Sequence, residues 1–122
     1  MNKYAKSKIQ FAFTPHLTPM FRGILSTIYI DLKPGFSIKK IENILKNFFL
    51  KKDLLKILKK NSFLSPNNVI NSNNCLISIC KTKDRKKIII LSVIDNLIKG
   101  GAGQAIQNLN TKFSFKTTEG FK

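Results

Sequence analysis

A histidine and an arginine near two prolines are the residues best suited to bind an anionic ligand. His16 lies in the segment TPHLTP (residues 14–19), whose prolines prevent a regular strand. Arg22 follows, just before an apolar stretch that begins at Ile24. A guanidinium held in this place can bind a carboxylate or a phosphate through two parallel N–H donors. The alternative is a loop-packing pair that binds no ligand.

A second group of candidates lies at the start of the last helix that the sequence predicts. Asn96 and Lys99 flank the glycine-rich stretch GGAG (residues 100–103). Unpaired backbone N–H groups at Gly100, Gly101 and Ala102 would favour an anion or the polar edge of a cofactor. The glycines could instead serve only to let helix and sheet pack closely, and the pattern alone is weak evidence for phosphate binding.

The two cysteines do not form a recognisable redox or metal site. Cys75 and Cys80 are five residues apart on what is expected to be one strand. An odd spacing places their side chains on opposite faces, so we expect no disulfide between them. Neither has the C-x-x-C spacing of a zinc or redox site. Both are interpreted as small core or surface residues in a reducing compartment.

The formal net charge of +16 permits two interpretations. One is a surface for nucleic acid or an anionic membrane. The other is the codon bias of an AT-rich genome, which favours Lys, Asn, Ile and Phe. The basic residues are spread along the chain, and the phenylalanines lie in apolar runs rather than among arginines, so nucleic-acid binding is not expected. The longest apolar run, residues 88–94, is too short to span a bilayer, and no export signal is visible. We therefore expect a cytoplasmic protein without a membrane segment.

The elements that must position these residues follow from hydrophobic periodicity. Ser37 is a candidate N-cap for a helix that runs to about Lys51, and its apolar stripe would be Ile38, Ile41, Leu45 and Phe48. A second helical piece is expected over residues 53–59, irregular chain over 61–74 and a last helix from Ala102. Strands are expected over residues 8–13, 24–32, 76–81 and 87–94, the last of them central and buried on both faces. The order predicts a single α+β domain over residues 1–122, with a mostly antiparallel sheet and helices packed on one face.

Three segments together resemble N-acetyl-γ-glutamyl-phosphate reductase. They are FTPHLTPMFRGI (residues 13–24), VINSNNC (69–75) and IDNLIKGGAGQAIQNLN (94–110), and they match the family in order and approximate spacing. The closing TTEGF (residues 117–121) also looks like the family's C-terminal end. The resemblance covers the chain from about Phe11 onward and corresponds to the C-terminal half of the family's length.

The resemblance implies an enzyme of two domains with separate roles. Enzymes of the family have a Rossmann domain for NADP and a second domain, like that of glyceraldehyde-3-phosphate dehydrogenase, for substrate and subunit contacts. A cysteine of the Rossmann side forms a thioester, which hydride from NADPH reduces to an aldehyde. Matching the segments implies a substrate side made of His16, Arg22, Ser72 and Asn73. It implies a nicotinamide side made of Asn96, Lys99 and Gly100.

The departures from the family pattern concern the chemistry itself. The chain has no G-x-G-x-x-G fingerprint for a dinucleotide, no Gly-Cys turn for the nucleophile, and no His-Arg-His segment ahead of the first match. No catalytic residue is therefore assigned, and the chain alone is expected to be inactive. Its expected partners are a separate or missing N-terminal Rossmann half and further copies of itself. The alternative function is a basic nucleic-acid- or protein-binding module on the same inherited fold.

Overall fold

The computed structural model describes residues 9–84 and 86–121 and contains one sheet and two α-helices. The elements in chain order are β1 (Ile24–Asp31), α1 (Ile38–Phe49), β2 (Leu55–Ile57), a 3₁₀ turn (Pro66–Asn68), β3 (Cys75–Lys81), β4 (Lys87–Ile94), a π-helical turn (Ile98–Ala102) and α2 (Gly103–Lys112). In the described ranges, no helix has both the length and the apolar character needed to cross a bilayer.

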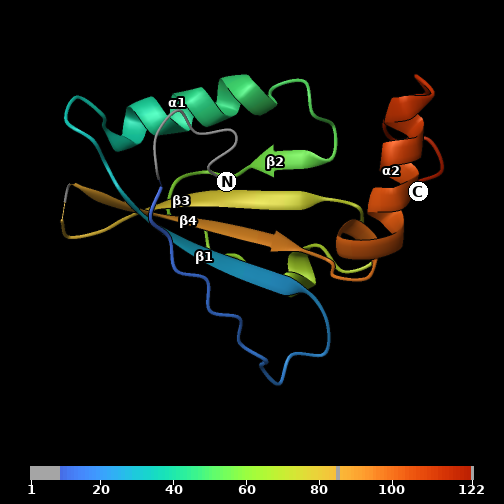
Figure 1. Ribbon diagram of the computed structural model, residues 1–122, viewed down its shortest axis with the longest axis horizontal. Helices are drawn as coiled ribbons and strands as arrows, with labels where there is room; N and C mark the ends of the chain where they lie inside the picture. The colour runs from blue at the N-terminus through green and yellow to red at the C-terminus, as the bar shows by residue number, and fades with distance from the viewer. Residues whose placement is uncertain (1–8, 85, 122) are drawn as a thin grey trace.

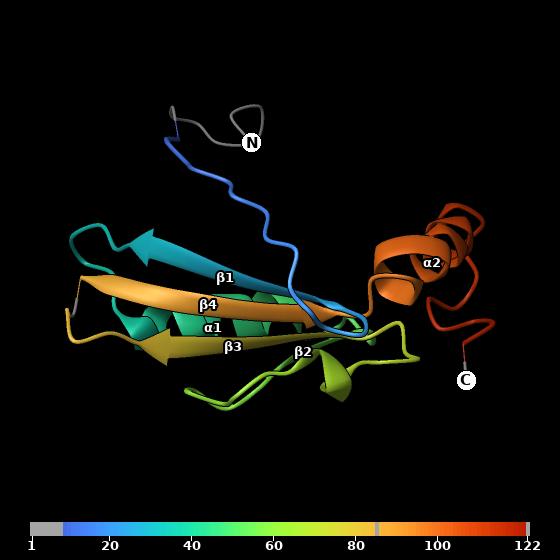
Figure 2. The same cartoon turned by 90° about the horizontal axis from the view of Figure 1, so that it is seen from below.

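The sheet is mixed, with strand order β1-β4-β3-β2. β4 pairs antiparallel with both β1 and β3, whereas β2 pairs parallel with β3. Helix α1 packs against β2 and β3, and α2 stands beyond the ends of the strands in both views (Figures 1 and 2). The predicted α+β class and mostly antiparallel sheet are confirmed. Of the two helices expected on one face, α1 takes that place and α2 lies at the end of the sheet.

Helix α1 begins where the sequence indicated. Ser37 has an extended backbone, and its hydroxyl accepts a hydrogen bond from the Lys40 amide at 3.3 Å, so it caps the first turn. The apolar stripe differs in its last member. Phe48 is 72% exposed, whereas Phe49 is half-buried and continues the stripe. The spacing of four from Leu45 to Phe49 keeps the stripe on the inner face, which a spacing of three does not do here.

Two predicted elements are wrong. The helical piece expected over residues 53–59 is instead the short strand β2, in which Leu55 and Ile57 are half-buried and Lys56 is exposed. This alternation is the period of a strand, and parallel pairing of Leu55 with Cys75 fixes it. Residues 9–13 belong to no strand of the described sheet; Lys8 lies outside the described residues.

Within the described residues the core is small, and β1 forms one edge of the sheet. The buried apolar side chains of the described residues are Val69, Ile79, Ile88 and Val93. β4 is central as expected, although most of its side chains are half-buried rather than fully covered. β1 is an edge strand with mostly exposed side chains, and Tyr29 is 76% exposed. Both cysteines of β3 are free, as their spacing predicted.

Gly23 fixes the entry into β1. Its φ is +109°, in the region that favours glycine. A Cβ at this position would lie 2.4 Å from the Cβ of Pro66 in the 3₁₀ turn. The start of β1 therefore passes so close to that turn that only glycine fits.

Gly23→Ala is expected to lower the free energy of unfolding by about 3 kcal/mol, from backbone strain and the contact with Pro66. Gly35→Ala is the matched control, because Gly35 also has a positive φ (+82°) but nothing lies within 4 Å of the place that an added methyl group would take. It should cost only about 1 kcal/mol. Urea unfolding followed by circular dichroism measures both, and equal losses would contradict the close approach.

Candidate functional site

A buried ion pair joins the start of β1 to the end of β4. The Nε of Arg22 donates to Oδ1 of Asp95 at 3.0 Å, and Nη2 lies 2.8 Å from Oδ2. The Asp95 side chain is fully buried, and that of Arg22 is 19% exposed. The two residues are 73 positions apart in the chain. The guanidinium fork that the sequence suggested for a ligand is thus already used on one edge by the protein itself.

Asp95 also organises two loops. Its Oδ2 accepts from the Asn71 amide at 2.8 Å, and its Oδ1 accepts from the Leu97 and Ile98 amides at 2.9 and 3.1 Å. The carboxylate therefore holds the loop before β3 and caps the turn that leads into α2. Sequence reasoning missed this role of Asp95. The available signal was an aspartate two and three residues ahead of amides at a helix start, the place where Asx side chains accept backbone hydrogen bonds.

The environment of Asp95 sets its ionisation. Burial by itself raises the pKa of this carboxyl group, but Arg22 and the three backbone amides outweigh burial and lower the pKa from 3.8 to about 2. Asp95 is therefore charged across the physiological range, and Arg22 balances that charge inside the protein.

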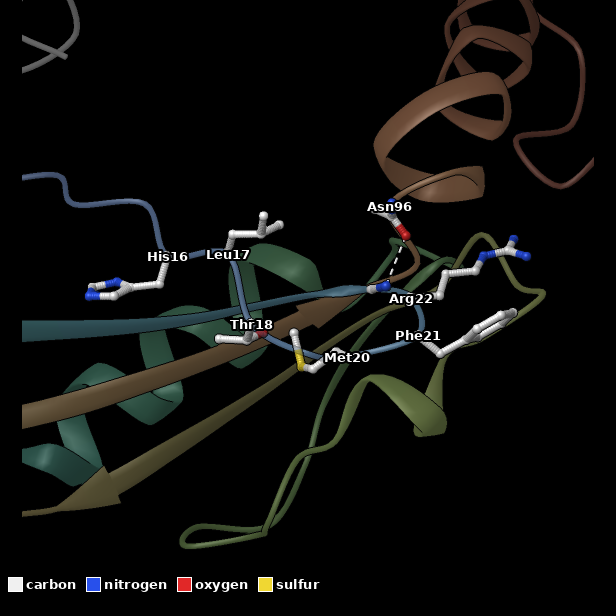
Figure 3. A pocket seen from close by; sticks show the side chains of 8 residues that line it. His16, Leu17, Thr18, Met20, Phe21, Arg22 and Asn96 are labelled. Carbon is white, nitrogen blue, oxygen red and sulfur yellow. Dashed lines mark hydrogen bonds between the residues drawn. The ribbon is translucent and has the colours of Figure 1, made fainter.

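A hollow of about 270 Å³ lies beside this ion pair, and we call it the loop pocket. It is lined by His16, Leu17, Thr18, Met20, Phe21, Arg22, Gly23 and Asn96. The loop after residue 15 forms one wall, and the segment after β4 forms the other (Figure 3). Three predicted site residues, His16, Arg22 and Asn96, thus line one hollow although they come from distant parts of the chain.

Within the loop pocket, the orientation of the side chains differs. The Asn96 Oδ1 accepts from the Gly23 amide at 2.8 Å, which leaves its Nδ2 donors unused by the described residues. The His16 ring nitrogen Nδ1 lies 3.1 Å from the Thr14 carbonyl, to which it donates. In Figure 3 the imidazole of His16 and the guanidinium of Arg22 point toward opposite ends of the hollow. One small ligand group would not touch both of them in this conformation.

Lys99 lines a different hollow from Asn96. This groove, of about 360 Å³, is called the Lys99 groove and is lined by Phe49, Lys51, Lys52, Asp53, Leu54, Leu55, Lys99, Gln107, Thr111 and Thr117. The Lys99 ammonium donates to Oε1 of Gln107. Burial lowers the pKa of Lys99, and the nearby Cys75 opposes that effect. Asn96 and Lys99, which are both expected on the nicotinamide side, therefore face separate hollows.

The backbone amides of the glycine-rich turn are less available than the sequence suggested. The Gly100 amide donates to the Asp95 carbonyl at 2.9 Å, and the Ala102 amide donates to the Leu97 carbonyl at 3.0 Å. The expectation of free donors is wrong for these two positions, because the π-helical turn consumes them. Gly100 itself is exposed, and a Cβ there would make only ordinary contacts.

Ser72 and Asn73 hold the loop before β3. The Ser72 hydroxyl donates to the Val69 carbonyl at 2.8 Å and accepts from the Asn74 amide at 3.4 Å. Asn73 is only 4% exposed, and its Nδ2 donates to Oε1 of Gln107 at 3.2 Å. Their substrate-binding role stays a prediction; the contacts seen here are internal to the protein.

Comparison with known families assigns the chain to a protein family. The family model described as the semialdehyde dehydrogenase dimerisation domain matches residues 1–96. The chain belongs to this family. The match includes β1 to β4 and ends at Asn96, so that α2 lies after it.

Curated relatives of this dimerisation domain are N-acetyl-γ-glutamyl-phosphate reductases. The chain is 43% identical over 120 residues to the one from Clostridium botulinum strain Alaska E43, with 98% of this chain and 35% of the relative covered. It is 39% identical over 120 residues to the probable chloroplastic one from Arabidopsis thaliana, with 98% and 30% covered. The chain thus spans about a third of the length of these relatives.

Solved structures agree on the fold. Aspartate semialdehyde dehydrogenase II from Vibrio cholerae superposes with a TM-score of 0.59 at 18% identity, covering 80% of this chain and 29% of that one. The same enzyme in complex with ASA gives 0.57 at 17% identity, again with 80% and 29% covered. At this identity the likeness supports the dimerisation-domain fold and nothing more specific. Among the described residues, no group of three or more His, Cys, Asp or Glu could hold a metal ion.

Asp95→Asn is expected to lower the free energy of unfolding by about 3 kcal/mol, because it leaves Arg22 without its buried counter-charge. Asp31→Asn is the matched control: the Asp31 carboxylate is 84% exposed and lies 3.8 Å from Lys87, so its loss should cost less than about 0.5 kcal/mol. Urea unfolding at neutral pH measures both. A loss for Asp95→Asn no larger than for Asp31→Asn would rule out the organising role.

The lowered pKa of Asp95 also predicts how stability depends on pH. Because the folded value (about 2) is below the ordinary value of 3.8, the stabilisation by ionised Asp95 is fully present above about pH 4 and is lost as the pH falls towards 2. The stability difference between wild type and Asp95→Asn should therefore shrink over this interval. Thermal unfolding of both proteins between pH 5 and pH 2 tests this, and a constant difference would contradict it.

Proposed function

We propose that this chain is the substrate-side part of an NADP-dependent N-acetyl-γ-glutamyl-phosphate reductase, which reduces N-acetyl-glutamyl 5-phosphate to the semialdehyde in arginine biosynthesis. The observation that carries the proposal is the loop pocket, which brings together His16, Arg22 and Asn96 from two segments of the chain that resemble the family. Identities of about 40% to reductases over nearly the whole chain support it.

On the substrate side, Arg22 is proposed to bind an anionic group of the substrate. Asp95 occupies the Nε–Nη2 edge of the guanidinium, so the edge formed by Nη1 and the second Nη2 proton remains for a carboxylate or phosphate oxygen. The buried carboxylate also keeps the guanidinium in one orientation. His16, exposed at the other end of the loop pocket, would contact another part of the substrate. Ser72 and Asn73, in the loop before β3, are also proposed to bind the substrate.

On the cofactor side, the chain fits only the nicotinamide end of NADP. Its sequence contains no G-x-G-x-x-G turn of the kind that holds a pyrophosphate. When bound, NADPH supplies the hydride. The proposed contacts of this chain are the Nδ2 of Asn96, oriented because Gly23 holds its Oδ1, together with Lys99 and the exposed Gly100. The thiol nucleophile and the nucleotide-binding fold would belong to protein outside these residues.

Further protein surface is needed on two sides of the domain. The exposed apolar side chains of β1 and the family's description as a dimerisation domain support assembly with a second copy. The position of α2 beyond the strands, with Ile106 and Leu109 exposed, supports contact with the Rossmann half. We propose that the assembly works in the cytoplasm. The comparisons give no support to the alternative of a basic nucleic-acid- or protein-binding module.

The decisive experiment supplies the missing half. The N-terminal part of the Clostridium botulinum reductase is fused or mixed with this chain, and NADPH oxidation is followed with N-acetyl-glutamyl phosphate. We expect no turnover by the chain alone and measurable turnover by the combination. An assembled complex that binds NADPH but never oxidises it with this substrate would overturn the proposal, as would turnover by the isolated chain.

Variants in the combined enzyme connect turnover to the loop pocket. His16→Ala and Asn96→Ala should each lower kcat/KM about tenfold or more, the effect of about 1.4 kcal/mol. Lys39→Ala, on the exposed face of α1, is the control and should leave kcat/KM unchanged. Unfolding curves show whether a loss comes from the pocket or from the fold.

A further inference from the structure

One side-chain oxygen on α2 accepts hydrogen bonds from two other parts of the chain. Oε1 of Gln107 lies 2.5 Å from the Lys99 Nζ and 3.2 Å from the Asn73 Nδ2. Lys99 belongs to the π-helical turn and Asn73 to the loop before β3. Gln107 on α2 therefore links the π-helical turn to the loop before β3.

The orientation of the Asn73 side-chain amide leaves its buried oxygen without a hydrogen bond among the described residues. A Cβ on Gly103, one turn before Gln107, would lie 2.4 Å from the Asn73 Oδ1, so that α2 packs directly against this amide. Asn73 is 4% exposed, and its Oδ1 is buried without a hydrogen-bond partner among the described residues. An unsatisfied buried acceptor costs on the order of 1–3 kcal/mol, and such a group in a native structure needs an explanation.

The charge on Lys99 supplies that explanation. An ammonium group can only donate, so Gln107 must turn its oxygen, not its NH₂, toward Lys99. The same oxygen can then only accept from Asn73, which must turn its Nδ2 inward and leave Oδ1 against Gly103. Turning the Asn73 amide over would place two oxygens against each other. The orphaned oxygen is therefore a consequence of how the Lys99 ammonium is held.

We propose that Gln107 is a positioning residue for Lys99 and that Asn73 fixes the orientation of the Gln107 amide. The three side chains hold the Lys99 ammonium at one place on the wall of the Lys99 groove. This role rests on the proposed function only for the ligand that Lys99 would contact. The hydrogen bonds among the three side chains do not depend on the proposed function.

The groups around Lys99 determine what its titration reports. The titratable residues that face the same groove or lie near the amine are Cys75 from β3 and Lys51, Lys52 and Asp53 from the segment after α1. They are unchanged in variants of Gln107. Burial lowers the pKa of Lys99, whereas an oxygen acceptor favours the charged form. Replacing that acceptor therefore changes one influence while the others stay in place.

The test measures the reactivity of the Lys99 amine in the full chain. Competitive acetylation over a series of pH values, with mass spectrometry of the Lys99 peptide, gives the midpoint of its titration. Gln107→Leu removes the acceptor and should move the midpoint to lower pH. Gln107→Glu keeps an oxygen and adds a negative charge, so it should move the midpoint to higher pH. Gln104→Leu is the matched control, since within the described residues the Gln104 side chain bonds to Asn108 on the same helix, and it should move nothing.

Opposite shifts in the two Gln107 variants are a result that a purely structural role would not produce. Circular dichroism establishes that each variant is folded, and Gln107→Glu alone remains decisive if Gln107→Leu unfolds. A Lys99 midpoint that stays at the wild-type value in the folded variants overturns the proposal. The reductase proposal is judged separately by turnover of the combined enzyme, so either proposal can fail while the other stands.

Discussion

The buried carboxylate of Asp95 is the constraint on which the rest of the site depends. It pairs with Arg22, accepts a hydrogen bond from the Asn71 amide, and accepts two more from the amides of Leu97 and Ile98. The start of β1, the loop before β3 and the turn before α2 therefore meet at one side chain. Each of these segments carries predicted site residues. A buried charge pair of this kind adds little net stability compared with apolar packing, but removing one partner is costly. Its effect is to fix relative positions, which a ligand pocket requires.

Much of the fold could be predicted from the sequence, because β1, α1, β3 and β4 carry clear periodic patterns and Ser37 is a recognisable cap. The short strand β2 could not be predicted in this way. Leu55 and Ile57 fit a helix as well as a strand when read alone, and the parallel pairing with β3 decides between them. Residues 9–13 show the reverse case, since a strand-like pattern there belongs to no strand of the described sheet.

The site was predictable as a set of residues but not as an arrangement. The resemblance grouped His16, Arg22 and Asn96, and the loop pocket does contain all three. No pattern in the sequence revealed that Arg22 would be paired with a residue 73 positions away, because a long-range ion pair leaves no local signal. Nor could spacing show that Lys99 faces another groove than Asn96. The π-helical turn that carries Lys99 also uses two of the amides that were expected to be free, those of Gly100 and Ala102.

The balance of buried groups supports the proposal that other protein covers part of this domain. Among the described residues, few apolar side chains are buried, while the polar residues Asn73, Ser78, Asp95 and Asn110 are buried. Polar contacts of this kind specify geometry more than they stabilise, so covering apolar surfaces that are still exposed would add to the hydrophobic contribution. Those surfaces are the apolar side chains of β1 and the outer side of α2. Each lies next to one part of the site, since β1 begins beside Arg22 and α2 carries Gln107. Covering them would therefore stabilise the domain and complete the walls of its pockets by the same contacts.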